Sequence, residues 1–80
     1  MKNINANTAI NAAVSYASVN AKDVCNLDVR HTEGFYEVTF ENDWTRYDCY
    51  VDDADGEVLG FDSRPLPEHV MLAELNRATA

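Results

Sequence analysis

The spacing of the apolar residues changes from a helical period to a strand period near residue 23, and this change constrains the fold most strongly. Within residues 4–18, apolar side chains recur three and four positions apart, which is typical of an amphipathic helix. Asn5 or Asn7 is the expected N-cap of this helix. The expected apolar stripe consists of Ile10, Ala13, Val14 and Ala17. Because the stripe is mostly alanine, we expect the helix to lie close against the surface that it covers.

After residue 23, apolar and polar side chains alternate, and this period of two predicts β-strands. The predicted strands cover residues 25–30, 35–41, 44–52 and 57–62. Their side chains on the buried face are expected to be Cys25, Leu27, Val29, Tyr36, Val38, Phe40, Tyr47, Cys49, Val51, Leu59 and Phe61. Turn-forming residues separate the strands at Gly34, at Asn42-Asp43 and at Asp53–Gly56. The four strands are therefore predicted to form one antiparallel meander.

Two prolines, Pro65 and Pro67, follow the last predicted strand. Residues 63–67 are expected to end the sheet, because proline cannot donate a hydrogen bond to a neighbouring strand. Pro67 suits the first turn of a final helix over residues 67–78. The predicted fold is α+β, with an N-terminal helix on a four-stranded antiparallel meander and a short C-terminal helix. A chain of 80 residues holds one domain, so residues 63–80 are expected to extend the compact unit formed by residues 1–62.

Three segments within this pattern resemble a PepSY domain. They are Glu37-Val38-Thr39-Phe40, Tyr47-Asp48-Cys49-Tyr50-Val51-Asp52 and Asp55-Gly56-Glu57-Val58-Leu59. The resemblance covers residues 4–62 and does not include the chain from Ser63 onward. It implies a small α+β fold and a non-enzymatic module, of the kind found in propeptides of thermolysin-like metallopeptidases and in cell-envelope proteins. It also implies a role in inhibiting or regulating a peptidase, and it brings no catalytic residues.

Acidic side chains outnumber basic ones by 14 to 6, for a formal net charge of −8. Such a surface repels the phosphates of nucleic acids and of anionic membranes, so neither is an expected partner. Residues 41–62 carry most of the charge, which favours a basic or cationic partner and a binding that salt weakens. No apolar run is long enough to cross a membrane, and the first residues lack a signal peptide. The chain as written is therefore expected in the cytoplasm, or in the cell envelope or outside the cell if upstream residues were removed.

No arrangement typical of an enzyme is present in the sequence. His31 and His69 are isolated from any residue that would make a nucleophile–base pair, and both are interpreted as solvated. The three glycines are interpreted as one per turn, which leaves no phosphate-binding loop. We therefore predict a non-enzymatic protein with no catalytic residue, no cofactor and no metal.

Cys25 and Cys49 are predicted to lie on the same buried face, two strands apart. Strand spacing separates them by about 9–10 Å, which exceeds the limit of about 7 Å between the Cα atoms of a disulfide. Both are therefore interpreted as reduced residues of the core. The two cysteines and two histidines also lack the spacing of a zinc site.

The turns also predict which side chains lie opposite each other on the exposed face. A two-residue turn at Asn42-Asp43 sets Glu37 opposite Asp48, and a similar turn at Thr32-Glu33 sets Asp28 opposite Glu37. Asp28, Glu37 and Asp48 would then form an acidic row across three strands. Such a row could hold Ca²⁺ or a basic group of a partner, or it could be an ordinary solvated surface.

Phe35, Trp44 and Tyr50 are predicted on the same exposed face, with Val58 as a further candidate, and such apolar patches mark contact surfaces. Three different partners would bury this face: the C-terminal helix of the same chain, a second copy of the chain, or another protein. The favoured function is a non-catalytic protein-binding module that regulates a peptidase or binds a basic segment, through this face or an open strand edge. Self-association as a homodimer is the alternative function, and cation binding is a third. The predicted partner-binding residues are Phe35, Trp44, Arg46, Asp48 and Tyr50.

Overall fold

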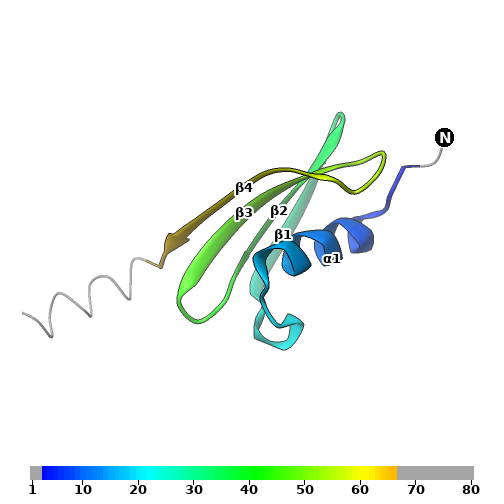
Figure 1. The fold of residues 1–80 in the computed structure, drawn as a ribbon. Helices are drawn as coiled ribbons and strands as arrows, with labels where there is room; N and C mark the ends of the chain where they lie inside the picture. The colour runs from blue at the N-terminus through cyan, green and yellow to red at the C-terminus, as the bar shows by residue number, and fades with distance from the viewer. Residues whose placement is uncertain (1–2, 67–80) are drawn as a thin grey trace, which may run out of the picture.

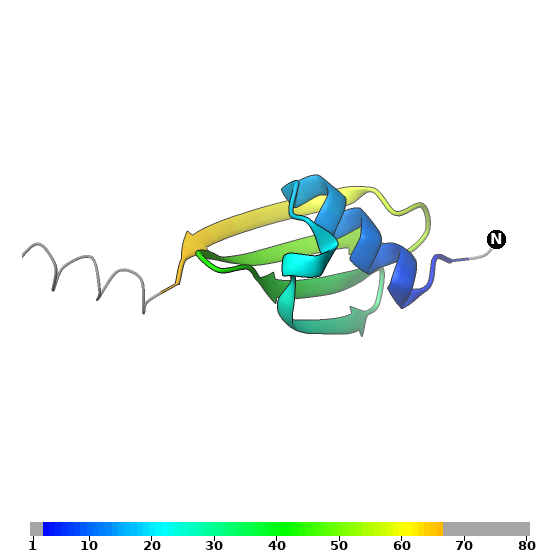
Figure 2. The same cartoon turned by 90° about the horizontal axis from the view of Figure 1, so that it is seen from below.

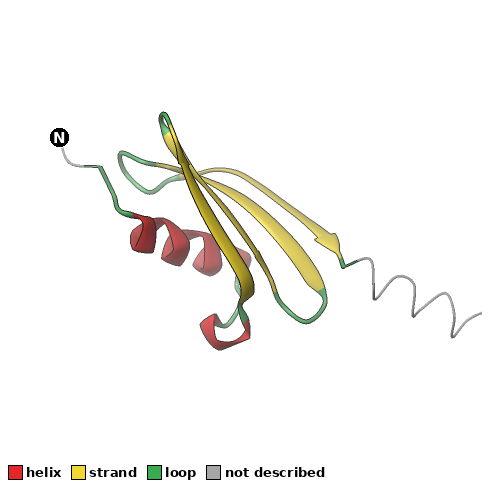
Figure 3. Cartoon of the chain, turned by 180° about the vertical axis from the view of Figure 1, so that it is seen from behind, coloured by secondary structure: helices red, strands yellow, loops and turns green. Residues whose placement is uncertain are grey.

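The structure, a computed structural model, describes residues 3–66 and consists of a helix packed on one face of a four-stranded sheet (Figure 1, Figure 3). The elements in chain order are α1 (Ala6–Ala17), η1 (Ala21–Asp23), β1 (Cys25–Thr32), β2 (Phe35–Glu41), β3 (Thr45–Asp52) and β4 (Val58–Pro65). The strands are antiparallel and lie in the order β1-β2-β3-β4. The α+β meander is therefore confirmed, whereas the predicted helix over residues 67–78 lies outside the described residues.

Helix α1 crosses one face of the sheet (Figure 2). We call this face the inner face and the opposite one the outer face. The side chain of Asn5 caps the helix, because its oxygen accepts a hydrogen bond of 2.8 Å from the backbone N–H of Thr8. Ala9 and Ala13 are fully buried, so the small side chains do allow the close packing that the sequence predicts. Ile10 and Val14 pack at the margin of the core.

The core lies between α1 and the two central strands. Its buried residues are Ala9, Ala13, Tyr36, Val38, Phe40, Cys49 and Val51. Aromatic rings extend it toward β4, with ring centroids 5.1 Å apart for Phe40 and Tyr47 and 5.8 Å apart for Tyr47 and Phe61. The alternation predicted for β2 and β3 is confirmed, since every second residue of β2 from Tyr36 to Phe40 is buried.

The alternation predicted for β1 is wrong at its beginning. Cys25 is exposed and Leu27 is 43% exposed, although both were expected in the core. A bulge interrupts the pairing between Cys25 and Asp28, and Asn26 within it has a φ of 52°. Helix α1 also lies mainly over β2 and β3, so the edge strand β1 receives less cover. Val29 does pack against the core.

A second bulge overturns the predicted position of Leu59. Tyr50 pairs with Gly60 and Val51 with Val58, which leaves Leu59 as the extra residue of β4. Leu59 is consequently 54% exposed, and Val58 packs against the core rather than on the outer face. Gly60 lies inside β4 and not in a turn, whereas Gly34 and Gly56 do occupy turns with positive φ.

The turn between β2 and β3 lies one residue further along the chain than predicted. The Asn42 side-chain oxygen accepts hydrogen bonds of 2.9 Å from the backbone N–H groups of Trp44 and Thr45. The backbone N–H of Asn42 also donates to the carbonyl of Thr45 at 3.0 Å. Asn42 and Thr45 therefore close the hairpin, and the register moves by two residues. An even shift preserves the faces, so the inward side chains of both strands stay inward.

The predicted acidic row is not formed in this register. The turn between β1 and β2 is centred on Glu33 and Gly34, with a φ of 97° at Gly34, so Glu37 lies opposite Arg30. On its other side Glu37 lies opposite Tyr50. Asp28 and Asp48 instead lie on either side of Thr39. Across β1, β2 and β3, the carboxylates of Asp28, Glu37 and Asp48 are thus not directly opposite one another.

Strand β4 continues beyond its predicted end. Pro65 still pairs with Thr45, and the backbone N–H of Leu66 donates to the carbonyl of Trp44 at 3.1 Å. The sheet tolerates this proline because β4 is an edge strand, where a missing N–H leaves no neighbouring strand unpaired.

Candidate functional site

An apolar hollow of about 310 Å³ lies on the outer face, between β2, β3 and β4. Its lining residues are Phe35, Tyr50, Leu59 and Gly60. The bulge in β4 brings Leu59 to this hollow, and Gly60, opposite Tyr50, adds no side chain to fill it. A Cβ atom at Gly60 would lie 3.3 Å from Cδ2 of Tyr50, closer than ordinary contact. We call this feature the outer hollow.

The two aromatic rings of the outer hollow form an edge-to-face pair. The ring centroids of Phe35 and Tyr50 are 5.6 Å apart, and the ring planes meet at 70°. Phe35 is half-buried, whereas Tyr50 is 36% exposed and presents part of its ring to solvent. The hollow therefore offers an accessible aromatic surface that α1 does not cover.

Three carboxylates act electrostatically on the hydroxyl of Tyr50. The Tyr50 hydroxyl donates to Oε2 of Glu37 at 3.5 Å. The negative charge of Glu37 raises the pKa of Tyr50, with smaller contributions from partial desolvation, from Asp48 and from Asp62. These three acidic side chains come from β2, β3 and β4, so the negative potential reaches the hollow from all three strands.

The chain itself neutralises only part of this negative charge. Asp48 pairs with Arg64, with 3.0 Å between Oδ2 and Nη2. Glu37 and Asp62 have no ion-pair partner within residues 3–66. The arginine opposite Glu37, Arg30, has its Nε 3.9 Å from a carboxylate oxygen of Asp28. Two carboxylates beside the hollow are thus without an arginine or lysine in the described part of the chain.

The predicted binding residues divide into two groups. Phe35 and Tyr50 line the outer hollow together. Trp44, 64% exposed, lies in the turn at the other end of β3, about 20 Å from Tyr50 by strand rise. Arg46 lies near that turn, where its Nη1 is 3.3 Å from Oε2 of Glu41.

Sequence reasoning missed the two residues of β4 that complete the hollow, Leu59 and Gly60. A glycine within a strand pattern often marks a bulge, and this signal was present at Gly60. Because Gly60 is assigned to a turn from the sequence, the bulge is not predicted, and Leu59 is therefore placed on the wrong face.

Asp28, Glu37 and Asp48, the predicted cation ligands, are not neighbours in one row. Within residues 3–66, no group of three or more His, Cys, Asp or Glu side chains is arranged to hold a metal ion. Asp48 and Asp28 each have an arginine within ion-pair distance instead.

His31 is exposed, as predicted, and it also makes specific contacts. Its Nε2 lies 2.8 Å from Oδ2 of Asp53, in the turn between β3 and β4. Its ring stacks on Tyr36, with 4.1 Å between centroids and 12° between planes. Asp53 also accepts a 2.7 Å hydrogen bond from the backbone N–H of Ile4. His31 therefore connects β1 to the turn that holds the N-terminal segment, while His69 lies outside the described residues.

The two cysteines occupy different environments, and neither is in a disulfide. Cys49 is fully buried, and desolvation raises the pKa of its thiol to about 11. Cys25 is exposed, which contradicts its expected place in the core. A buried neutral thiol such as Cys49 behaves as a small apolar residue.

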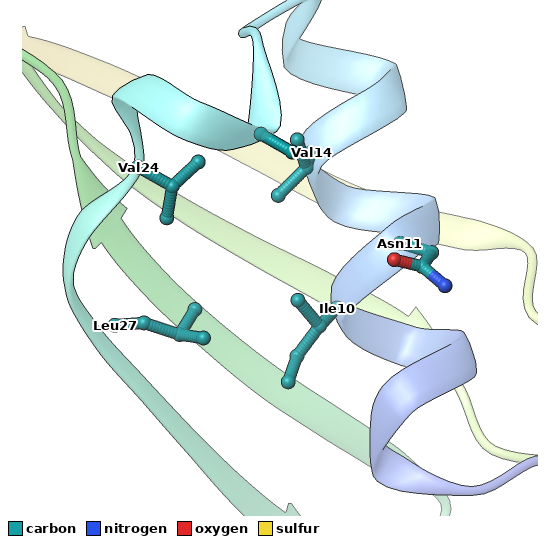
Figure 4. Close-up of a pocket in the computed structure, with 6 residues that line it drawn as sticks. Ile10, Asn11, Val14, Val24 and Leu27 are labelled. Carbon is teal, nitrogen blue, oxygen red and sulfur yellow. The ribbon is translucent and has the colours of Figure 1, made fainter.

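A second hollow, of about 250 Å³, opens between α1, η1 and the edge strand β1 (Figure 4). Ile10, Val14, Val24 and Leu27 converge on it, and Asn11 and Ala21 complete its lining. We call it the helix groove. It lies on the inner side of the sheet, whereas the outer hollow lies on the opposite face. The exposed side chains of Leu27 and Leu59 thus belong to different surfaces.

Comparison with protein-family models, with curated proteins and with solved structures finds no match to this chain. The resemblance to PepSY domains therefore stays a prediction. Within residues 3–66, no helix is long and apolar enough to span a membrane.

Proposed function

We propose that this chain is a non-catalytic protein-binding module that receives a basic segment of another protein on the outer face of its sheet. The outer hollow is the observation that carries the proposal, because it joins an accessible aromatic surface to carboxylates that lack a cation within residues 3–66. Aromatic surface supplies contact area, and complementary charge supplies specificity and a fast encounter.

Net charge favours a foreign basic partner over a second copy of the chain. Two copies with a formal charge of −8 each would repel one another on approach. A basic segment would instead be attracted to the same surface. The resemblance to PepSY domains adds a peptidase as the first class of partner to assay, by inhibition or regulation of its activity.

A longer partner segment would also contact the predicted partner-binding residues that lie outside the outer hollow. An extended chain rises about 3.3 Å per residue, so about six residues would reach from the outer hollow to Trp44. Arg46 and Asp48 lie along β3 between these two points. Trp44, Arg46 and Asp48 therefore stay predicted contacts for a segment of that length.

Selection from a random peptide library displayed on phage tests the proposal, with Leu59→Asn as the diagnostic variant. Leu59 is 54% exposed, so the substitution removes apolar surface from the outer hollow without emptying the core. Leu27→Asn is the matched control, because Leu27 is 43% exposed and lines the helix groove. We expect selected peptides to be rich in Lys and Arg, to lose affinity for Leu59→Asn and to keep it for Leu27→Asn.

Two results would contradict this function. One is a selection that enriches no peptide for the wild-type chain. The other is a set of enriched peptides whose affinity depends on Leu27 and not on Leu59, which would place binding at the helix groove.

A further inference from the structure

We propose that the outer hollow is a receptor for one arginine side chain of the partner, whose guanidinium lies on the ring of Tyr50 between Glu37 and Asp62. The inference rests on the proposed function, since it specifies the group that the outer face recognises. It concerns a single side chain, so it can be tested without the whole partner.

The shape of the outer hollow suits an arginine side chain. Part of the Tyr50 ring is exposed, the Phe35 ring forms an edge-to-face pair with it, and Leu59 lines the same hollow. A planar guanidinium stacks on such a ring, and the methylene groups of its side chain lie along apolar surface. Gly60 keeps this space open, because any larger residue would bring a Cβ within 3.3 Å of the Tyr50 ring.

The positions of Glu37 and Asp62 suit a cation on the Tyr50 ring. Glu37 lies directly opposite Tyr50 on β2, and its Oε2 is 3.5 Å from the Tyr50 hydroxyl. Asp62 lies on β4, two residues beyond Gly60, which pairs with Tyr50 on its other side. A group on the Tyr50 ring would thus have one carboxylate toward each neighbouring strand. Neither carboxylate has an ion-pair partner within residues 3–66.

The chain already forms arginine–carboxylate pairs between neighbouring strands of the outer face. Arg64 reaches across from β4 to Asp48 on β3, with 3.0 Å between Nη2 and Oδ2. Arg46 reaches Glu41 from β3 to β2 in the same way. Each outer-face arginine of β3 and β4 is therefore engaged with another carboxylate, whereas Glu37 and Asp62 have no ion-pair partner within residues 3–66. An arginine from a partner would continue the pattern.

Arginine is favoured over lysine by the geometry of the receptor. A guanidinium can stack on the Tyr50 ring and donate to carboxylates at both sides in one plane, whereas an ammonium is a compact point charge. N-acetyl-arginine N-methylamide is therefore the probe, and its citrulline counterpart is the matched control with the same shape and no charge. The lysine counterpart measures the preference between the two cations.

Titration of the labelled full chain with each probe, followed by amide and aromatic NMR signals at low salt, tests the receptor. We expect the arginine probe to shift the signals of Tyr50, Leu59 and Gly60, the citrulline probe to leave them in place, and the lysine probe to bind several-fold more weakly. Equal shifts from arginine and citrulline, or arginine shifts confined to other residues, would overturn the proposal. So would equal binding of arginine and lysine.

Charge-removing variants provide the second readout. Glu37→Gln and Asp62→Asn are each expected to weaken binding of the arginine probe by about three-fold, the range of a partly exposed ion pair. Asp23→Asn is the matched control, because it removes the same charge from η1, away from the outer face, and is expected to change affinity far less. An effect of Asp23→Asn equal to the other two would show general attraction by net charge and would overturn the receptor.

The selected peptides separate this inference from the proposed function. If peptides bind through Leu59 and keep their affinity when each arginine is replaced by citrulline, the receptor is wrong and the proposed function stands. If the arginine probe binds at Tyr50 but no peptide is enriched, the receptor stands and the proposed function fails.

Discussion

At the scale of single residues, the two cysteines show how far the surroundings of a side chain depend on its place along a strand. Cys49 is fully buried in a central strand, and burial raises the pKa of its thiol to about 11. Cys25 begins an edge strand at a bulge and is exposed. We expect a thiol reagent at neutral pH to modify Cys25 rapidly in the native protein and Cys49 only after unfolding. Rapid loss of both thiols without denaturant would contradict the burial of Cys49.

The raised pKa of Cys49 also predicts how stability depends on pH. Between the ordinary thiol pKa of 9.0 and the value of about 11 in the fold, the unfolded chain loses the Cys49 proton while the folded chain keeps it. Stability is therefore expected to fall as the pH rises through this window. Urea unfolding at several pH values measures the fall. The Cys49→Ala variant is the control, and an equally steep fall in that variant would assign the effect to other groups.

At the scale of elements, the cap of α1 gives a sharp test of how the helix begins. Asn5 accepts a 2.8 Å hydrogen bond from the N–H of Thr8, whereas Asn7 is an exposed residue of the first turn. Asn5→Ala is expected to lower the free energy of unfolding by about 1 kcal/mol. Asn7→Ala, the matched control, is expected to change it by less than about 0.5 kcal/mol. Urea denaturation measures the free energy of unfolding of both variants. A larger loss of stability for Asn7→Ala than for Asn5→Ala would mean that Asn7 is the N-cap.

The central strands give a second test at this scale. Phe40 is 1% exposed in β2, and its ring packs against Tyr47 at a centroid distance of 5.1 Å. Phe40→Ala is expected to cost about 3–5 kcal/mol of stability, because it empties a large volume between sheet and helix. Thermal unfolding measures the loss. A cost comparable with that of an exposed aromatic such as Trp44 would mean that the inner face is not the core.

The element order and the strand faces of β2 and β3 follow from periodicity and could be predicted from the sequence, whereas the cap was predicted only as Asn5 or Asn7. The register could not, because it depends on the side chain of Asn42, which closes the hairpin with two hydrogen bonds. The edge strands could not either, since a bulge in each shifts the alternation that a strict period of two assumes. The outer hollow depends on one of these bulges, and so the predicted site lacked Leu59 and Gly60.

At the scale of the whole molecule, net charge sets the expected state of association. Because each chain carries a formal charge of −8, we expect a monomer at low salt, where repulsion between copies is least screened. Light scattering gives the mass directly. A stable dimer in low salt would favour the alternative function, self-association, and would place a second copy among the candidate covers of the outer face.

The salt dependence of peptide binding reports the summed electrostatic field of the whole molecule rather than one contact. Peptides selected for binding are expected to lose affinity steadily as NaCl is raised from 0.05 to 0.5 M, since screening shortens the reach of charge. Isothermal titration at each salt concentration measures the change. An affinity that does not depend on salt would assign binding to apolar contact alone.

The central claim is that a partner binds the outer face and leaves the helix groove free. The methyl groups of Leu59 and Leu27 report on these two surfaces separately, because the former lines the outer hollow and the latter the helix groove. We therefore regard NMR contacts between a selected basic peptide and these methyl groups as the most direct measurement. Contacts of the peptide with Leu59 and none with Leu27 are predicted, and contacts with Leu27 alone would contradict the claim.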